Sequence, residues 1–144
     1  MAESQRPGSR RGPLRAADPL ARVAARVLRW ERARRARIEL ALLGPTAMRR
    51  LNRRATGRRG LTDVIAFTLP QPDGAILGDV YICPAAARAF VTGDRLGEEL
   101  VRLAVHGTLH VLGYDHPDGP GRTRSAMWQR QERYVRRLMG RGRA

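Results

Sequence analysis

Apolar residues recur at two different spacings along the chain, and these spacings predict where it forms helices and strands. Leu20, Val23, Val27 and Trp30 follow the three- and four-residue spacing of an amphipathic helix, which we predict for residues 19–35. Over residues 37–42 the apolar positions instead alternate with mostly polar ones, which is typical of a strand. The amino-terminal third of the chain therefore combines both kinds of element.

Turn residues divide the remaining apolar segments into further elements. Two strands are predicted at residues 62–69 and 75–83, and the turn Gln-Pro-Asp-Gly at 71–74 predicts that they pair as an antiparallel hairpin. Helices are predicted at 45–52, 85–91 and 123–139, and one more begins after a capping Asp94 and is closed by Gly113. The predicted fold class is α+β: a small mixed sheet of three to four strands packed with about five helices.

The helix before Gly113 is apolar on nearly every side, which predicts that it lies covered at the centre of the domain. It nevertheless carries His106 and His110, which are four residues apart and so share one helix face. Gly113 can take a left-handed turn that brings His116 back toward this pair. The segment of 11 residues from His106 to His116 contains every histidine of the protein.

Three neutral imidazoles would leave the fourth position of a tetrahedral zinc ion open, as in catalytic zinc sites. We therefore predict that His106, His110 and His116 bind one metal ion per chain and act through that ion and its water. Zinc is the expected metal, and nickel, copper and iron also accept imidazole nitrogen. The alternative is that one or two of these residues are ordinary helix or loop histidines.

The same histidine spacing occurs in a signature of zinc metalloproteases, where a glutamate after the first histidine acts as general base. The corresponding residue here is Gly107. Peptide hydrolysis by that route lacks its base, so a protease is the weaker interpretation.

The segment HGTLHVLGYDH, residues 106–116, resembles the H-G-x-L-H-L-x-G-Y-D-H signature of the YbeY family of endoribonucleases. Upstream, LN at 51–52, TDVIAF at 62–67 and GDV at 78–80 resemble further segments of that family in the same order. The resemblance covers about residues 20–139. Two positions depart from the pattern: Ala66 stands where the family usually has serine, and Thr56 where it usually has an arginine.

The resemblance implies a single-strand-specific, metal-dependent endoribonuclease of rRNA maturation, acting at the 3′ end of 16S rRNA and in ribosome quality control. It also implies rRNA and the small ribosomal subunit as partners, with a ribosomal protein or an assembly GTPase as further ones. His106, His110 and His116 would be the metal ligands. Two alternatives stay open: an RNA-binding assembly factor with a structural zinc, and a metallohydrolase of another substrate.

The charge distribution favours an anionic partner, with nucleic acid ahead of a membrane. The formal net charge is +15, and all 28 basic residues are arginine. Residues 18–60 carry 13 arginines and 3 acidic residues, residues 61–117 carry 3 and 7, and residues 118–144 carry 8 and 2. We expect the basic loop that follows the helix at 45–52 to bind RNA phosphates, through Arg53, Arg54, Arg58 and Arg59. The alternative is that these arginines only solvate the surface.

Three carboxylates are candidates to support the metal site without binding the metal. Asp63 and Asp79 lie in or beside predicted strands, where they either face solvent or orient a histidine. Asp115 adjoins His116 and could orient it, and a role as general base is less favoured.

The composition predicts one domain at residues 18–140, a disordered basic tail at 1–17 and a frayed end at 141–144. The single Cys83 cannot form an internal disulfide, so we expect a packed thiol in a reducing, cytoplasmic setting. No apolar segment approaches the length that spans a bilayer.

Overall fold

A three-stranded sheet forms the centre of the structure, a computed structural model that describes residues 18–140. The strands are β1 (Ala36–Leu42), β2 (Val64–Pro70) and β3 (Ile76–Ile82), in the spatial order β1-β3-β2. β1 runs parallel to β3, with Ala36 opposite Ile76, whereas β2 pairs antiparallel with β3, with Val64 opposite Ile82. The sheet is therefore mixed, and the predicted hairpin and α+β fold are confirmed.

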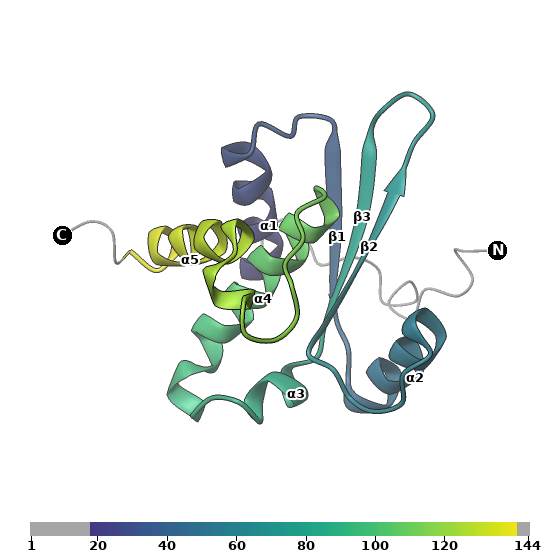
Figure 1. The fold of residues 1–144 in the computed structure, drawn as a ribbon, viewed down its shortest axis with the longest axis vertical. Helices are drawn as coiled ribbons and strands as arrows, with labels where there is room; N and C mark the ends of the chain where they lie inside the picture. Colours follow the sequence, from purple (N-terminus) through teal and green to yellow (C-terminus); the bar gives the residue numbers. More distant parts are fainter. Residues whose placement is uncertain (1–17, 141–144) are drawn as a thin grey trace.

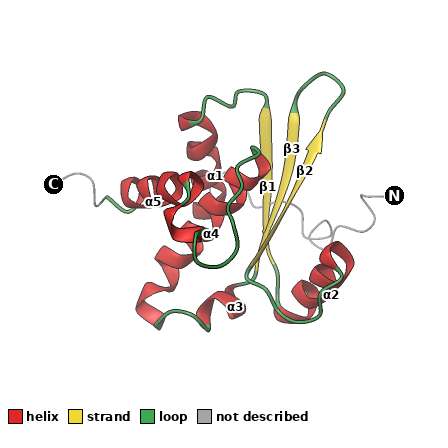
Figure 2. Cartoon of the chain, in the orientation of Figure 1, coloured by secondary structure: helices red, strands yellow, loops and turns green. Residues whose placement is uncertain are grey.

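Within residues 18–140, five α-helices accompany this sheet, and three of them, α1, α4 and α5, lie beside one another (Figure 1). Their bounds are α1 (Pro19–Trp30), α2 (Pro45–Thr56), α3 (Pro84–Arg88), α4 (Leu96–Val111) and α5 (Ala126–Leu138). Figure 2 shows α2 set apart from that group, at the end of the sheet where β2 begins. The site described below lies between α4 and the segment that follows α2.

The main core lies between α4 and the sheet face to which Leu40, Val80 and Ile82 belong. Eight residues of α4 are buried, which confirms the prediction of a central, covered helix. A second cluster packs α2 against Tyr81 and Cys83 at the sheet. Cys83 is a buried free thiol, as predicted.

Two glycines allow α4 to approach β3 closely. A Cβ atom added at Gly107 would lie 2.6 Å from Cγ1 of Val80, and one added at Gly78 would lie 2.4 Å from Cγ1 of Val111. Both distances are too short for real carbon atoms, so neither position accepts a side chain without movement. Gly78 and Val80 therefore face α4, and the residue between them faces the opposite side of the sheet.

Several predicted element ends were wrong. α1 ends at Trp30 and not near residue 35, because Arg32 takes a left-handed conformation and the Ala33 N–H bonds to the Leu28 carbonyl, which closes the helix as a Schellman motif. α2 continues past residue 52 to Thr56, where Gly57 closes it in a left-handed conformation.

Three further predicted ends were wrong: the end of α3 and the starts of α4 and α5. α3 stops at Arg88, short of the predicted residue 91. Asp94 does not cap α4: it lies in a short 3-10 helix, Gly93–Arg95, and its carboxylate accepts a hydrogen bond from Thr92. α5 begins at Ala126 because the Ser125 hydroxyl accepts the Trp128 N–H, whereas the expected start lies in another short 3-10 helix, Arg122–Arg124.

The predicted tail at 1–17 and the frayed end at 141–144 lie outside the described residues. No helix among residues 18–140 is long and apolar enough to cross a membrane.

Candidate metal centre

The three histidines converge on one point. Their ligand nitrogens all lie within 4.8 Å of one another, and the ring centroids are 4.6 Å apart for His106 and His110 and 5.1 Å for each pair that includes His116. His106 and His110 come from one face of α4, and His116 comes from the loop that follows Gly113, which has a φ of 103°. This is the arrangement that the spacing predicted.

A hydrogen bond to Gln131 of α5 fixes the orientation of His106. Nδ1 of His106 lies 2.6 Å from Oε1 of Gln131, and Nε2 of Gln131 donates to Glu132 at 3.0 Å. Since the amide oxygen can only accept, Nδ1 carries the hydrogen, and Nε2 of His106 keeps its lone pair. Gln131 is 1% exposed, so this contact is sheltered from water.

His116 is fixed in the same way by the backbone. Its Nδ1 donates to the Pro117 carbonyl at 3.1 Å, which again leaves Nε2 as the free donor atom for a metal. Its N–H donates to the Asp115 carboxylate at 2.8 Å. Asp115 therefore binds the backbone of the loop at His116, and its predicted role in orienting that ring stays a prediction.

The loop is tied to the rest of the domain through Tyr114. Its hydroxyl donates to Glu31 at 2.7 Å, and Arg130 and Tyr134 of α5 donate to the same carboxylate. Burial alone would raise the pKa of Glu31, but these hydrogen bonds lower it below its usual value. The ionised Glu31 thus joins the end of α1, the histidine loop and α5.

Burial keeps two of the histidines neutral. It lowers the pKa of His106 to about 4, although the hydrogen bond that His106 donates to Gln131 favours the charged form. Burial also lowers the pKa of His110, and the nearby His116 adds to the effect. Neutral imidazole is the form that binds a metal, so His106 and His110 are already in their binding form near pH 7.

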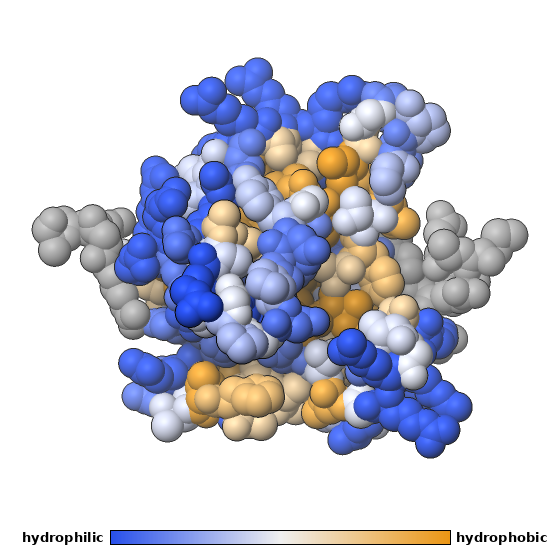
Figure 3. Space-filling view, viewed as in Figure 1, coloured by the Kyte–Doolittle hydropathy of each residue, from blue (hydrophilic) through white to orange (hydrophobic). Residues whose placement is uncertain are grey.

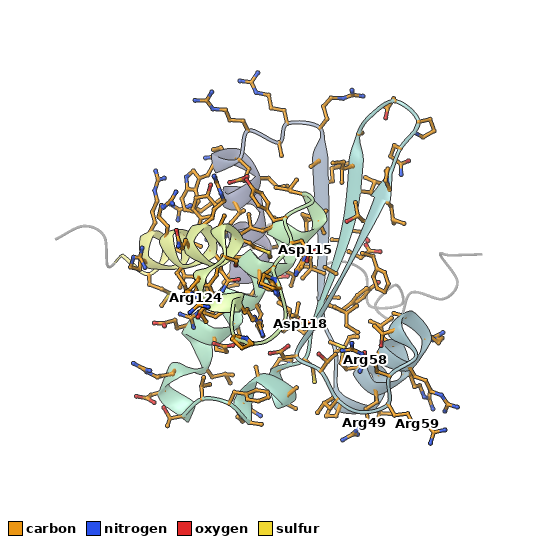
Figure 4. All side chains as sticks on the ribbon, in the orientation of Figure 1. Arg49, Arg58, Arg59, Asp115, Asp118 and Arg124 are labelled. Atoms are coloured by element: carbon orange, nitrogen blue, oxygen red, sulfur yellow. The ribbon has the colours of Figure 1, made fainter. Side chains whose placement is uncertain are left out.

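A cleft of about 570 Å³ opens beside the histidines. His106, Gly107 and His110 form one wall, and residues of β2 and of the segment after α2 form the other. Arg58 and Arg59 line this second wall, together with Asn52 and Thr56. Figure 4 shows Arg58 at the α2 side of the site and Asp115 and Asp118 on the loop after α4.

A protein-family model described as Endoribonuclease YbeY matches residues 15–139. The chain belongs to the YbeY family. Curated YbeY endoribonucleases include one from Mycobacterium ulcerans that is 40% identical over 94 residues, covering 56% of this chain and 53% of that protein. One from Mycobacterium sp. strain KMS is 40% identical over 96 residues, covering 58% and 54%. The chain thus matches about half the length of these relatives.

A solved structure supports the same fold. The solution structure of TM1509 from Thermotoga maritima is 26% identical to this chain, with a TM-score of 0.55 over 91% of this chain and 89% of that one.

Thr56 stands where the YbeY pattern has an arginine, and it hydrogen-bonds to residues on both sides of it. The Thr56 hydroxyl lies 2.9 Å from Oδ1 of Asn52 and accepts the Arg58 N–H at 3.1 Å, and Nδ2 of Asn52 donates to the Gly60 carbonyl at 3.2 Å. These bonds fold the segment after α2 so that Arg58 and Arg59 line the cleft. Two arginines of the cleft lining therefore follow Thr56 within three residues.

The other predicted RNA-binding arginines are placed differently. Arg53 and Arg54 lie in the last turn of α2 and not in a loop, and both are exposed. They do not belong to the lining of the cleft. Only the second pair of the predicted four is next to the histidines.

Two of the predicted supporting carboxylates, Asp79 and Asp63, have different surroundings. Asp79 points to the sheet face away from α4, since its neighbours Gly78 and Val80 face that helix, so it is not placed to orient a histidine. Asp63 lies just before β2, where burial raises its pKa and the charge of Arg122 opposes that rise. Burial is the largest cause of the lowered pKa of His106 and His110, and the charge of Arg122 lowers both pKa values further. The same arginine therefore acts on Asp63 and on two of the histidines.

Gln131, Glu31 and Tyr114 support the site but were not predicted from the sequence. No local sequence pattern marks Gln131 or Glu31. One signal was available for Gln131: it is a polar residue on the apolar side of an amphipathic helix, next to buried Met127 and Tyr134.

Proposed function

We propose that this chain is a metal-dependent endoribonuclease whose ion is bound by His106, His110 and His116. The observation that carries the proposal is the convergence of three histidine donors, within 4.8 Å of one another, beside a cleft. Two of these histidines, His106 and His110, line that cleft together with Arg58 and Arg59. A cation site at a cleft whose lining includes two arginines suits a phosphodiester, because the cation and the arginines both attract its negative charge. We propose zinc as the ion, since three imidazoles are a common donor set for catalytic zinc.

The residues around the histidines fit such an ion. Nδ1 of His106 and Nδ1 of His116 are both occupied by acceptors, so both rings offer Nε2. The imidazoles of His106 and His110 are neutral at pH 7 because burial lowers their pKa. When bound, the ion would supply Lewis acidity, which polarises a phosphoryl oxygen and lowers the pKa of a water.

The protein residues would bind and orient the RNA around that centre. Arg58 and Arg59 would hold the phosphates that flank the scissile bond, with Thr56 and Asn52 fixing the backbone of their segment. Gln131 would hold the proton on Nδ1 of His106 throughout the reaction, so that this ring stays a neutral ligand. Gly107 leaves no carboxylate next to the first ligand, which separates this site from the zinc proteases.

The proposed substrate is an rRNA precursor, cleaved in a single-stranded region in the cytoplasm. Support comes from relatives named Endoribonuclease YbeY and from the net charge of +15. The open cleft, rather than a closed pocket, suits a polymer that enters and leaves along its length.

Two variants separate the metal from the RNA contacts. His110→Ala should lose the bound metal and cleavage together. Arg58→Gln with Arg59→Gln should keep the metal, measured by elemental analysis, while cleavage of an rRNA fragment falls by about 10- to 100-fold. The matched control is Arg49→Gln with Arg50→Gln, an equal change of charge on exposed residues of α2 outside the cleft lining.

Cleavage by purified His110→Ala protein at the wild-type rate would contradict the proposal. So would a wild-type protein that binds rRNA without cutting it and only loses thermal stability when the metal is removed. That second result would make the ion structural and the chain an assembly factor.

A further inference from the structure

A second basic surface lies outside the cleft, where α1 and α5 meet. Arg22, Arg26 and Arg29 lie within one narrow arc of α1, since residues four and three apart share a helix face. Arg133 and Arg137 lie one turn apart on α5. All five side chains are exposed, and Figure 3 shows strongly hydrophilic residues over α5. We call these five residues the α1–α5 surface.

Trp30 joins the two helices. Its ring centroid is 5.1 Å from that of Tyr134, and the guanidinium carbons of Arg26 and Arg137 lie 5.1 Å and 4.4 Å from the Trp30 centroid. Two arginines from different helices are therefore stacked on one ring. Stacking restricts their rotamers and leaves the hydrogen-bonding edges of each guanidinium available to a ligand.

The acidic residues next to this surface are already bonded elsewhere. α1 contains no acidic residue. Glu31 accepts bonds from Arg130, Tyr114 and Tyr134, and Glu132, which is the one acidic residue of α5, accepts bonds from Arg102 and Gln131. Within residues 18–140, no ion pair joins an acidic residue to any arginine of the α1–α5 surface.

Uncompensated like charges repel one another and lower the stability of the folded state. An anionic partner that covers the surface removes this cost. The position of these arginines on one helix face and their residue type both fit a phosphate backbone. Arg22 and Arg29 are about 10 Å apart along α1, which is long enough for the two arginines to contact different phosphates of one strand. Guanidinium groups also bind phosphates through paired N–H donors.

We propose that the α1–α5 surface binds the phosphate backbone of a structured part of the RNA, at a distance from the segment that enters the cleft. The proposal rests on the proposed function for the identity of the polymer as RNA. It adds a second contact outside the lining of the cleft, so that a folded RNA is bound at two places while only its single-stranded segment reaches the metal centre.

The test is the variant Arg22→Gln/Arg29→Gln/Arg133→Gln, which leaves both arginines on Trp30 in place. Its control is Arg37→Gln/Arg88→Gln/Arg95→Gln, three exposed arginines outside both basic regions, with the same change of charge. Binding to an RNA hairpin with a single-stranded end is measured with chelator present, over a range of salt concentrations. Cleavage of a short single-stranded RNA with zinc is measured separately.

The surface variant should bind the hairpin about tenfold more weakly at 0.1 M salt, and the slope of log K against log salt should decrease by about 2 to 3, since each lost phosphate contact contributes about 0.9. The control should change binding by less than about twofold, and both variants should cleave the short RNA at the wild-type rate.

Equal loss of hairpin binding in the two triple variants would overturn the proposal, because only net charge would then matter. Unchanged binding in the surface variant would overturn it as well. So would a selective loss of binding to anionic lipid vesicles with unchanged RNA binding. The two proposals can also fail separately. If the wild-type protein does not cleave the short RNA, but only the surface variant loses hairpin binding, the proposed nuclease function is wrong and the proposed RNA-binding surface is supported.

Discussion

His106 is oriented by a neutral amide and not by a carboxylate. In many metal sites a carboxylate accepts the second N–H of a histidine ligand and increases the basicity of the ring. Gln131 also orients the ring, with its Oε1 2.6 Å from Nδ1 of His106, but it adds no negative charge. Its own amide is held by Glu132, which Arg102 binds through two nitrogens at 2.8 and 3.0 Å. A chain of polar contacts thus leads from the metal centre through α5 to α4.

Replacing Gln131 by leucine should weaken zinc binding by about 10- to 100-fold, because His106 loses the acceptor that fixes its ring. Replacing it by glutamate should preserve or tighten binding, since the carboxylate still accepts from Nδ1. Competition with a chromophoric chelator measures both affinities. Gln129→Leu, on the exposed side of the same helix, is the matched control and should leave zinc affinity unchanged. Wild-type affinity in Gln131→Leu would show that the contact does not position the ligand.

The low pKa of His106 makes the stability of the metal-free protein depend on pH. The folded-state pKa is about 4 because the ring is buried, against 6.5 when the chain is unfolded. Between these values the unfolded chain binds more protons, so stability is complete above pH 6.5 and decreases as the pH falls toward 4. The full effect is roughly 3 kcal/mol at most.

Urea unfolding of the metal-free protein at pH 7.5, 6.5 and 5.5 should therefore give a falling free energy of unfolding. His106→Gln, which has no group to protonate at this position, should show a flatter dependence over the same range. Parallel curves for the two proteins would contradict the pKa assigned to His106.

Helix α4 is positioned by its close contact with β3, and this contact depends on Gly107. The residue directly follows His106, so any side chain that forces α4 away from Val80 also moves this proposed metal ligand. Alanine here would gain about 1 kcal/mol in helix propensity. The Cβ would lie 2.6 Å from a buried branched side chain, which costs about 1–3 kcal/mol by overpacking.

We expect Gly107→Ala to lower the free energy of unfolding, measured with urea, and to weaken zinc binding. Gly97→Ala is the control on the same helix: its Cβ would meet no atom within 4 Å, so stability should stay the same or increase by up to about 1 kcal/mol. Equal effects from the two substitutions would mean that helix–sheet contact at Gly107 is not tight.

For the helices and strands, local sequence chemistry predicted where most of them lie but few of the residues at which they begin or end. The apolar alternation of β1 and the turn of the β2–β3 hairpin are local, so both were confirmed. The end of α1 was not, because Arg32 adopts a left-handed conformation that a sequence pattern would assign to glycine or asparagine. The fifth helix also began later than expected, since a 3-10 turn precedes the capping Ser125.

Across the fold, the proposed metal site combines three histidines that are close in sequence with supporting residues that are distant in sequence. The histidines were predictable because one helix turn and one glycine bring them together. Gln131 is 25 positions from His106, and Glu31 is 83 positions from Tyr114, so only the packing of α1 and α5 around α4 reveals them. Asp79 was misjudged because strand alternation alone does not say which sheet face α4 covers.

The most direct test of the account is one titration: cleavage of a single-stranded rRNA fragment by metal-stripped protein as zinc is added back. Three histidines that converge on one point predict that cleavage is absent without zinc and recovers fully at one equivalent per chain. Cleavage that persists in the stripped protein, or that zinc does not restore while the fold remains intact, would contradict the assignment of this site.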